Sequence, residues 1–493
     1  MKTNKSSNLL ILLRLGEITI KSKRTRRRFE NILVNNIKDA LNYNNINDYK
    51  IYREWGRIYI ETSDRRALEV LRRVFGIKSL SPVTCIKFTH LKDLVEQIKP
   101  LVVDKIRNKT FAVRARRVGE HDYTSMDIAK ELGAALIEYS RGVDLNNPEV
   151  EVGVEVRWNR AYVYTEVIKG YGGLPIGTEG RVVSLVSGGF DSAVAAWYML
   201  KRGAIVDYLL CNLGGLAHER GVLSVLKVLA DKWSYGYRPV LYTVDFRPLV
   251  KEIMSKCNIS LFNIILKRYM YRAAQRIAHS IGAEAIVTGE SLGQVSSQTL
   301  TNLEVSSRAV EIQILRPLIG MDKDEIIERA REIGTYEPSS LVEEFCALFV
   351  RHPKTRASLK EVLEEEAKID RSVFEDIMSK VKSIDLKSLS REDLLPADIK
   401  IVNIPEDAIV IDLRDKEEYE KWHYPEAINI PLTDLVKTVS KLGRDKTYVL
   451  YCRAGAESLE GALLLRSMGY KAFSLKGPIE RVKCLARKSK VAS

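Results

Sequence analysis

The sequence predicts a multidomain α/β protein whose central domain is a doubly wound parallel sheet. Residues 178–340 alternate short β-branched runs with amphipathic helical stretches, which is typical of parallel strands joined by crossover helices. A glycine-rich turn at residues 187–192 joins the first strand of this region to its first helix. The chain has 493 residues, which is too long for one hydrophobic core. That length predicts about three or four domains.

The composition predicts a soluble protein of a reducing compartment. No apolar run approaches the ~18 residues that a membrane span needs, and the run Leu9–Leu13 is short, is followed by Arg14 and lacks a cleavage site. Six cysteines lie far apart without a Cys-x-x-Cys pair, which argues against a disulfide framework or zinc site and for the cytoplasm. The net charge of +14 favours a polyanionic partner.

The turn after the strand Arg181–Val186 has the residues of a phosphate cradle. It reads Ser187-Gly188-Gly189-Phe190-Asp191-Ser192 and leads into an Ala-rich helix. Two glycines let consecutive N–H groups point at one anion, and the helix start adds partial positive charge. The Ser187 and Ser192 hydroxyls can donate further hydrogen bonds. The alternative is a strand-turn-helix that binds no ligand.

Two further features refine this prediction. No Gly-x-x-x-x-Gly-Lys-[Ser/Thr] pattern occurs, so we expect a pyrophosphate to be held by backbone and hydroxyls rather than by a fixed ammonium. Bare phosphate would repel the Asp191 carboxylate, so we expect Asp191 to hold a Mg²⁺ that bridges the phosphates.

The first part of the chain predicts two α+β units. Residues 9–20 form a strand pattern, 49–52 and 57–61 a hairpin, and 65–75 a helix. A basic run leads into another helix from Phe29, and we expect its cations to contact phosphates: Lys21, Lys23, Arg24, Arg26, Arg27 and Arg28. The alternative for this run is a solvated helix face.

The second unit spans residues 80–170. Its strand Phe111–Arg117 alternates, and we expect its basic residues, Arg114, Arg116 and Arg117, on one face. A helix is expected at 125–140 and a hairpin at 150–157 and 161–167. Residues 170–177 are rich in glycine and form a linker.

The central region has strand patterns near 181–186, 204–211, 238–244 and 284–288, and helix patterns near 192–201, 219–232, 262–281 and 323–333. Ligands of such sheets bind at the carboxyl ends of the strands. We therefore expect the Ser187 turn, Leu210-Cys211-Asn212 and Thr288-Gly289 to lie together.

Two strings of this region carry further polar groups. In Lys267-Arg268-Tyr-Met-Tyr271-Arg272, the spacing of four places Lys267 with Tyr271 on one helix face. A solvated cationic face is the alternative. In Gly289-Glu290-Ser-Leu-Gly-Gln-Val-Ser-Ser-Gln298, glycines after a strand suit close approach to a nucleotide, and Gln298 can donate and accept.

The last part of the chain predicts a charged helical connector at 355–395 and a further α/β unit. In that unit Cys452 follows a strand and precedes a helix, where helix N–H groups stabilise a thiolate. Cys346 lies beside Phe345 and Phe349, and from the residues alone it is a small core residue.

The turn at 187–192 resembles the signature of the PP-loop ATP pyrophosphatases, which split ATP between its α and β phosphates. Together with the string at 289–298, the local string Gly16-Glu17…Lys21 and the order of units, it is similar to the tRNA 4-thiouridine synthetase (ThiI) family. The resemblance implies a ferredoxin-like domain at 1–77, a THUMP RNA-binding domain at 78–170, a PP-loop domain at 171–354, the linker at 355–395 and a rhodanese domain at 396–493.

The resemblance also implies the site. ATP would be bound by Leu185, Val186, the Ser187–Ser192 turn, Leu210, Cys211, Lys267, Gly289 and Gln298, with Mg²⁺ at Asp191. Cys452 would carry a persulfide, and Cys346 would face the adenylated substrate and form a disulfide with Cys452. Glu457 stands where many rhodaneses have arginine, which disfavours thiosulfate as the sulfur source and favours a cysteine desulfurase.

The implied reaction is the conversion of uridine 8 of tRNA to 4-thiouridine, with a further role in thiamin thiazole synthesis through a sulfur-carrier protein. The alternatives are a PP-loop enzyme that thiolates another tRNA base and a non-catalytic tRNA-binding or sulfur-relay adaptor. The sequence leaves the oligomeric state open, with a homodimer as one option.

Overall fold

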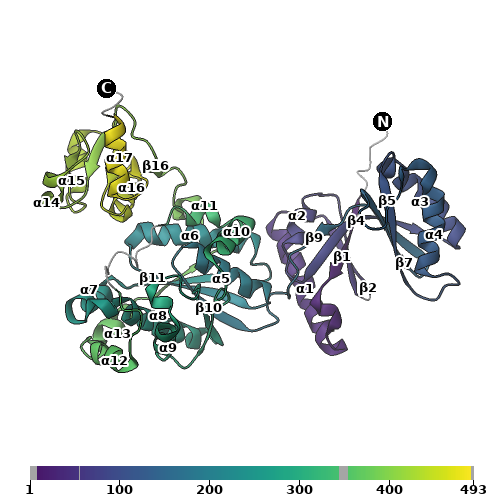
Figure 1. The fold of residues 1–493 in the computed structure, drawn as a ribbon, viewed down its shortest axis with the longest axis horizontal. Coiled ribbons are helices and arrows are strands. Elements are labelled where there is room, and N and C mark those ends of the chain that lie inside the picture. The colour runs from purple at the N-terminus through teal and green to yellow at the C-terminus, as the bar shows by residue number, and fades with distance from the viewer. Residues whose placement is uncertain (1–7, 55, 343–352, 490–493) are drawn as a thin grey trace. The chain divides into compact units, whose positions relative to one another are not determined.

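The computed structural model describes residues 8–54, 56–342 and 353–489. Cys346 therefore lies outside the described residues. The chain divides into two compact units, Met1–Thr178 with Lys201–Gly203, and Glu179–Leu200 with Ala204–Ser493 (Figure 1). Within the described ranges, no helix combines the length and the apolar character that crossing a membrane requires.

The first unit is one nine-stranded sheet with helices. Its elements are β1 (Leu9–Leu15), α1 (Lys23–Tyr43), β2 (Tyr49–Glu54), β3 (Arg57–Thr62), α2 (Ala67–Arg72), β4 (Ile77–Lys87), α3 (Leu91–Ile106), β5 (Thr110–Val118), α4 (Ser125–Leu136), β6 (Gly142–Val143), β7 (Val150–Arg157), β8 (Arg160–Tyr164) and β9 (Ile168–Lys169). The strand order is β2-β3-β1-β4-β8-β7-β5-β6, with β9 also on β4. Strand β4 pairs with β1 and then with β8, so the two predicted α+β units share a strand.

A buried ion network ties the two halves of this sheet together. Glu155 of β7 is 2% exposed, and it accepts hydrogen bonds from Arg14 Nε of β1 and Arg57 Nε of β3, each at 3.0 Å. Burial raises the pKa of Glu155, but Arg57 and Arg14 outweigh it and hold the pKa below its usual range. Because a buried charge is costly without its partners, this network fixes one half of the sheet against the other.

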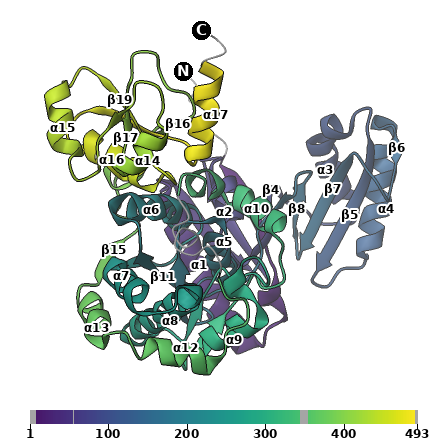
Figure 2. The same cartoon turned by 60° about the vertical axis from the view of Figure 1, so that its left-hand side comes forward.

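Helices α3 and α4 cover one face of the β5–β7–β8 part of the sheet (Figure 2). Alternate residues of β5 and β7 face these helices, as the period of two requires, and among them Phe111, Val152 and Val154 are fully buried. Arg114 and Arg116 are exposed, whereas Arg117 has the opposite parity along β5. The prediction that all three share one face is therefore wrong.

The second unit contains a mainly parallel sheet and an entirely parallel one. Its elements are β10 (Arg181–Val186), α5 (Phe190–Lys201), β11 (Ile205–Asn212), α6 (Gly215–Lys232), β12 (Val240–Asp245), α7 (Arg247–Lys256), α8 (Phe262–Ile281), β13 (Ala285–Val287), α9 (Leu300–Ser307), β14 (Gln313–Leu315), α10 (Lys323–Ile333), α11 (Tyr336–Ser339), α12 (Leu359–Glu366), α13 (Arg371–Ser379), β15 (Lys382–Asp385), β16 (Lys400–Ile401), β17 (Ile409–Asp412), α14 (Lys416–Lys421), β18 (Ile428–Asn429), α15 (Leu435–Leu442), β19 (Thr447–Tyr451), α16 (Ala456–Ser467), β20 (Lys471–Leu475) and α17 (Ile479–Ser489). The predicted doubly wound sheet and the C-terminal α/β unit are both present.

The first of these sheets has the order β14-β13-β10-β11-β12-β15. Strands β10 to β14 are parallel, and the chain order reverses at β10, which lies between β11 and β13. Helices α7 and α8 pack on one face around Val183, Leu209 and Ile286. The crevice at such a reversal point is where open α/β sheets bind ligands.

Residues 355–395 were expected to be a connector, but most of them belong to this domain. Strand β15 adds antiparallel to β12, and Val362 of α12 and Ile377 of α13 are buried in the core beside α8. Glu366 of α12 accepts a hydrogen bond from Arg268 Nε at 2.7 Å. The charged composition of these residues did not predict this packing. One of the charges, Glu366, is itself partly buried because it pairs with a buried arginine of the same domain.

The second sheet has the order β16-β20-β19-β17-β18, and all its pairs are parallel. Helix α16 follows β19 after a short turn that begins at Cys452. The predicted thiol therefore stands at the carboxyl end of a central strand.

Candidate active site

The turn between β10 and α5 has the shape of an anion cradle. Gly188 has φ +83°, and a Cβ there would stand 2.8 Å from Val342 Cγ1 and 3.1 Å from Val222 Cγ2, so only glycine fits. Ser192 Oγ donates to Gly189 O at 3.2 Å and closes the turn, while Ser187 stays exposed at its mouth. The turn thus brings successive N–H groups to the start of α5.

A second backbone segment lies directly against this turn. Gly289 follows β13, and a Cβ on it would stand 2.6 Å from Ser192 N and 2.7 Å from Asp191 C. Distances this short exclude any side chain at position 289. The prediction that the Ser187 turn and Gly289 lie together at the strand ends is confirmed.

Asp191 makes two contacts that the sequence did not reveal. Its carboxylate accepts hydrogen bonds from Lys323 Nζ at 2.9 and 3.2 Å, and from Gln294 Nε2 at 3.0 Å. A lysine from α10 therefore stands beside the turn, although the turn itself encodes none. Lys323 is 132 residues from Asp191, and its one sequence signal is its place at the start of a capped helix.

Glu290 is the centre of a buried network beside the cradle. It is 3% exposed, and its carboxylate accepts hydrogen bonds from Lys267 Nζ at 2.7 Å, Arg316 Nε at 2.7 Å, Tyr271 Oη at 2.8 Å and Thr288 Oγ1 at 2.9 Å. Burial alone would raise the pKa of Glu290, but Lys267 and Arg316 outweigh it and lower the pKa to about 2. The predicted pairing of Lys267 and Tyr271 on one helix face is confirmed, and both of them bind this carboxylate.

The remaining predicted nucleotide contacts lie around the same edge. Gln298 Oε1 accepts from Ser291 N at 3.2 Å, so this amide fixes the loop that follows β13. Val186, Leu210 and Cys211 are buried at the ends of β10 and β11, so their side chains belong to the core. What they offer a ligand is their backbone.

His218 is a further residue that sequence reasoning missed. It lies in α6, is 4% exposed, and its Nε2 is 3.0 Å from Ser187 O. Burial lowers the pKa of His218 to about 4, although the contact with Ser187 raises it. At neutral pH the imidazole is uncharged, and its Nε2–H donates to the carbonyl that begins the cradle.

Not all the predicted RNA-contacting cations are available to phosphates to the same degree. Lys21, Lys23, Arg24, Arg27 and Arg28 are exposed at the entrance to α1. Arg26 Nε is 2.8 Å from Glu30, and Arg114 Nε is 3.1 Å from Glu151. The entrance to α1 is therefore the denser cationic surface.

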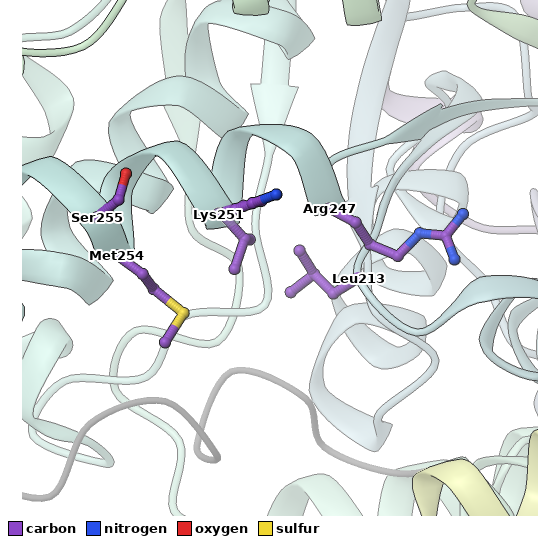
Figure 3. A pocket seen from close by; sticks show the side chains of 6 residues that line it. Leu213, Arg247, Lys251, Met254 and Ser255 are labelled. Carbon is purple, nitrogen blue, oxygen red and sulfur yellow. The ribbon is translucent and has the colours of Figure 1, made fainter. Parts of the chain in front are cut away.

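A hollow of about 460 Å³ lies beside α7 (Figure 3). It is lined by Leu213, Arg247, Val250, Lys251, Met254 and Ser255. None of the cradle residues lines it, so we distinguish this hollow from the nucleotide cradle.

In the C-terminal domain, the turn after β19 surrounds a sulfur atom. Cys452 is 3% exposed, and Gly455 N, in a residue with φ +97°, donates to Cys452 Sγ at 3.1 Å. Ser458 Oγ lies 3.7 Å from the same sulfur and 2.9 Å from Ser474 Oγ. An N–H group that donates to sulfur, with the start of α16 beside it, stabilises a sulfur anion.

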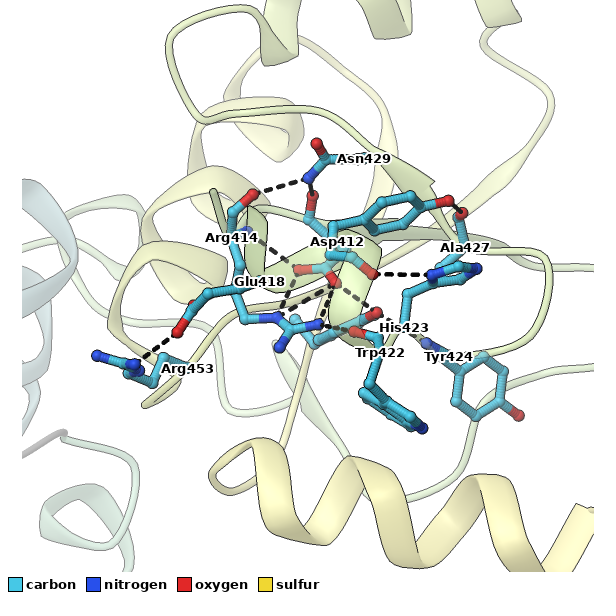
Figure 4. A network of polar contacts seen from close by, with 11 residues as sticks. Asp412, Arg414, Glu418, Trp422, His423, Tyr424, Ala427, Asn429 and Arg453 are labelled. Carbon is cyan, nitrogen blue, oxygen red and sulfur yellow. Dashed lines mark hydrogen bonds and ion pairs between the residues drawn. The ribbon is translucent and has the colours of Figure 1, made fainter. Parts of the chain in front are cut away.

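A buried polar network supports this turn from the neighbouring strand (Figure 4). Asp412 of β17 accepts from Arg414 Nη2 at 2.6 Å and from Tyr451 Oη at 2.7 Å, and Tyr451 directly precedes the cysteine. Arg453, which follows the cysteine, pairs with Glu418. These contacts fix Tyr451 and Arg453, the residues on either side of Cys452.

Comparisons with known proteins agree with this architecture. The family models that match are the ThiI ferredoxin-like domain at residues 10–81, the THUMP domain at 88–166, the thiamine biosynthesis protein (ThiI) at 177–371 and the rhodanese-like domain at 399–483. The expected fold class of four α/β and α+β domains is confirmed.

Whole-length relatives are also found. A tRNA sulfurtransferase of Pyrobaculum aerophilum is 44% identical over 473 residues, which is 95% of this chain and 96% of the relative. One of Desulfurococcus amylolyticus is 42% identical over 96% of this chain and 98% of its own. The crystal structure of a 4-thiouridine synthetase–RNA complex with bound ATP is 32% identical, with a TM-score of 0.66, covering 76% of this chain and 99% of that chain.

The Glu290 network predicts a pH-dependent contribution to stability. We expect Glu290→Gln to lower the free energy of unfolding at pH 7 by roughly 2–4 kcal/mol, because Lys267 and Arg316 lose their buried counter-charge. The pKa of Glu290 is depressed in the folded protein, so its contribution is full above about pH 4.5 and is lost as the pH falls through about 2. Urea unfolding followed by tryptophan fluorescence measures this difference.

The matched control is Glu304→Gln, because Glu304 pairs with Arg308 on the exposed face of α9. Exposed pairs contribute little, so this variant should shift stability by less than about 0.5 kcal/mol. Equal effects of the two substitutions would show that the Glu290 network contributes no more than a surface ion pair.

Proposed function

The chain belongs to the ThiI family of tRNA sulfurtransferases, and from this premise we propose that it adenylates uridine 8 of tRNA and replaces the uracil 4-oxygen by sulfur. The observation that carries the proposal is the edge where Gly289 closes on the Ser187–Ser192 turn. At that edge Lys323 of α10, which is not part of the turn, binds the carboxylate of Asp191 in the pyrophosphate cradle.

We assign the nucleotide contacts as follows. The N–H groups of Gly188 and Gly189, the Ser187 hydroxyl and the start of α5 bind the pyrophosphate part of ATP. Backbone at the ends of β10 and β11 and the loop fixed by Gln298 frame the nucleoside. Lys323 leaves Asp191 for a phosphate oxygen, and its side chain, 39% exposed, has room to do so.

Asp191 fits one ligand of a magnesium ion, because a carboxylate oxygen at the mouth of the cradle is a ligand that Mg²⁺ prefers. When bound, the ion offsets negative charge on the pyrophosphate. The residues of the chain hold the α-phosphate in line with the uracil O4. That oxygen attacks phosphorus, the bond to pyrophosphate breaks, and the base carries AMP as a leaving group.

Sulfur transfer uses the second site. A Cys452 persulfide is kept anionic by the Gly455 N–H group and the start of α16. Its terminal sulfur attacks C4 of the base, directly or as released sulfide, and AMP leaves. In the direct route, the Cys346 thiolate attacks Cys452 Sγ, which frees the 4-thiouridine and leaves a Cys346–Cys452 disulfide for a cellular thiol to reduce.

Several partners follow from this chemistry. The cations at the start of α1 and on β5 bind tRNA phosphates. Because its substrate is tRNA, we also propose that the enzyme works in the cytoplasm. A cysteine desulfurase supplies the persulfide, because Glu457 keeps an acidic group beside the sulfur site.

We also propose a role in thiamin thiazole synthesis, with a sulfur-carrier protein as acceptor, because the model that matches residues 177–371 is described as a thiamine biosynthesis protein. A deletion strain is then expected to need thiamin for growth, and the Cys452→Ser gene should fail to restore growth without it. Growth of the deletion strain at the normal rate in thiamin-free medium would exclude this role.

Replacing the cradle carboxylate should stop the first step alone. We expect Asp191→Ala to reduce tRNA-dependent pyrophosphate release at least 100-fold, because the magnesium ion loses its carboxylate ligand, while tRNA affinity changes less than two-fold. Asp245→Ala is the control, since Asp245 pairs with Arg247 at the end of β12, two strands from β10 in the same sheet, and should leave release intact. Normal pyrophosphate release by the Asp191 variant would contradict the assignment.

Replacing the persulfide carrier should stop the second step alone. With a desulfurase as the sole sulfur source, Cys452→Ser should still release pyrophosphate but form no 4-thiouridine, because an alcohol cannot hold a transferable sulfur. The absorbance of thiouridine in the near ultraviolet measures the product. Cys484→Ser, an exposed cysteine of α17, is the control and should keep the full yield. Unchanged yield in the Cys452 variant would refute the role.

A further inference from the structure

The turn between β7 and β8 carries a tryptophan in a backbone conformation that suits glycine. Arg157 pairs with Arg160 across the hairpin, so Trp158 and Asn159 form a two-residue turn. Trp158 has φ +54°, and the other described non-glycine residues with positive φ are two asparagines, Asn45 and Asn108, and a glutamate. Such turns usually hold Gly, Asn or Asp, because a bulky side chain strains the left-handed conformation.

Neighbouring strands hold this turn in place. Trp158 N donates to Val118 O at 3.1 Å, and Trp158 O is 2.7 Å from His121 Nε2. Arg117 Nη1 lies 3.2 Å from His121 Nδ1, so Nδ1 accepts from the guanidinium and Nε2–H donates to the Trp158 carbonyl. A Cβ on Gly119 would stand 3.1 Å from Trp158 Cε3, which shows that the indole rests on the glycine backbone.

The indole of Trp158 is not part of the hydrophobic core of this part of the chain. Trp158 is 66% exposed, although tryptophan is highly buried on average in folded proteins. A single exposed apolar side chain is common and by itself indicates nothing. What sets this residue apart is that a strained backbone and several hydrogen bonds keep its ring at the surface, and such strain gathers at functional positions.

Exposed cations lie on the strands that flank the turn. Lys87 of β4 and Arg160 of β8 are opposite one another in the sheet, and Arg116 is exposed near the end of β5. Exposed acidic residues are also present, at Glu120 and Asp122 of the next loop. A flat aromatic surface among lysine and arginine side chains is the arrangement with which proteins bind single-stranded nucleic acid.

We propose that Trp158 is a stacking platform for an unpaired nucleobase of the RNA substrate. The proposal rests on the proposed function, because it needs the THUMP part of the chain to bind tRNA. The indole supports the face of the base, which every nucleobase has, and Lys87, Arg116 and Arg160 attract the adjoining phosphates. Stacking adds affinity for unpaired nucleotides without reading their sequence.

The turn offers a variant that separates binding from folding. Trp158→Gly removes the ring and relieves the positive φ, so we expect its melting temperature to equal or exceed that of the wild-type protein. Full-length wild-type, Trp158→Gly and Trp158→Phe proteins are titrated with an RNA hairpin bearing a single-stranded extension and with the same hairpin lacking it. A 2-aminopurine in the extension reports stacking by loss of its fluorescence.

We expect Trp158→Gly to bind the extended hairpin about 5- to 50-fold more weakly than wild type, with an unchanged slope against salt concentration and no quenching of 2-aminopurine. Trp158→Phe should recover most of the affinity, and the hairpin without extension should bind all three proteins alike. Arg160→Gln, as the charge control, should reduce the salt slope by about one.

Equal binding of the extended hairpin by the wild-type and glycine variants would overturn the platform, as would equal quenching of 2-aminopurine. A loss of affinity that is the same for both hairpins would also overturn it, because the effect would not depend on an unpaired base. If the wild-type protein bound neither RNA, the proposed function of this part of the chain would fail instead.

Discussion

The nucleotide-binding edge depends on a contact between two backbones that leaves no room for a side chain. Gly289 stands so close to Asp191 and Ser192 that any Cβ would displace the first turn of α5. Because β13 and β10 are neighbours at the reversal point of the sheet, this contact fixes the cradle to the loop that carries Glu290 and Gln298. That one approach fixes the N–H groups of the turn and the backbone of Asp191, whose carboxylate binds Lys323 of α10.

The cations of this edge divide into two kinds. Lys267 and Arg316 are bound by the buried Glu290 carboxylate, so their charge is compensated within the protein. Lys323 is more exposed and pairs with Asp191 at the mouth of the cradle, where a phosphate can compete for it. The first pair gives the site its shape, and we propose that Lys323 supplies the ammonium that other phosphate-binding loops encode within the loop itself.

Local patterns were enough to predict β10, β11, β12 and β13 of the central sheet, the cradle and the cysteine turn, because each depends on a continuous stretch of residues. Lys323 was missed because its partner is 132 positions away, and no local pattern records an ion pair at that distance. Strand β15 was missed because it has four residues and pairs at an edge, where alternation is weak. The sequence did not single out Trp158, because its unusual feature is a positive φ, which the residue type does not reveal.

We propose that the acidic groups near Cys452 select among sulfur donors. Glu457 opens α16 one turn from the sulfur, and burial, together with Asp415 and Glu418, raises the pKa of Glu457. In this proposal Glu457 and Asp415 disfavour a small anion such as thiosulfate, and Glu418 is in part compensated by Arg453, while Gly455 N–H stabilises the sulfur within. A protein-bound persulfide avoids this repulsion, because it brings no free dianion to these carboxyl groups. The choice of sulfur donor would then depend on charges outside the turn, whereas the reactivity of the sulfur depends on the groups inside it.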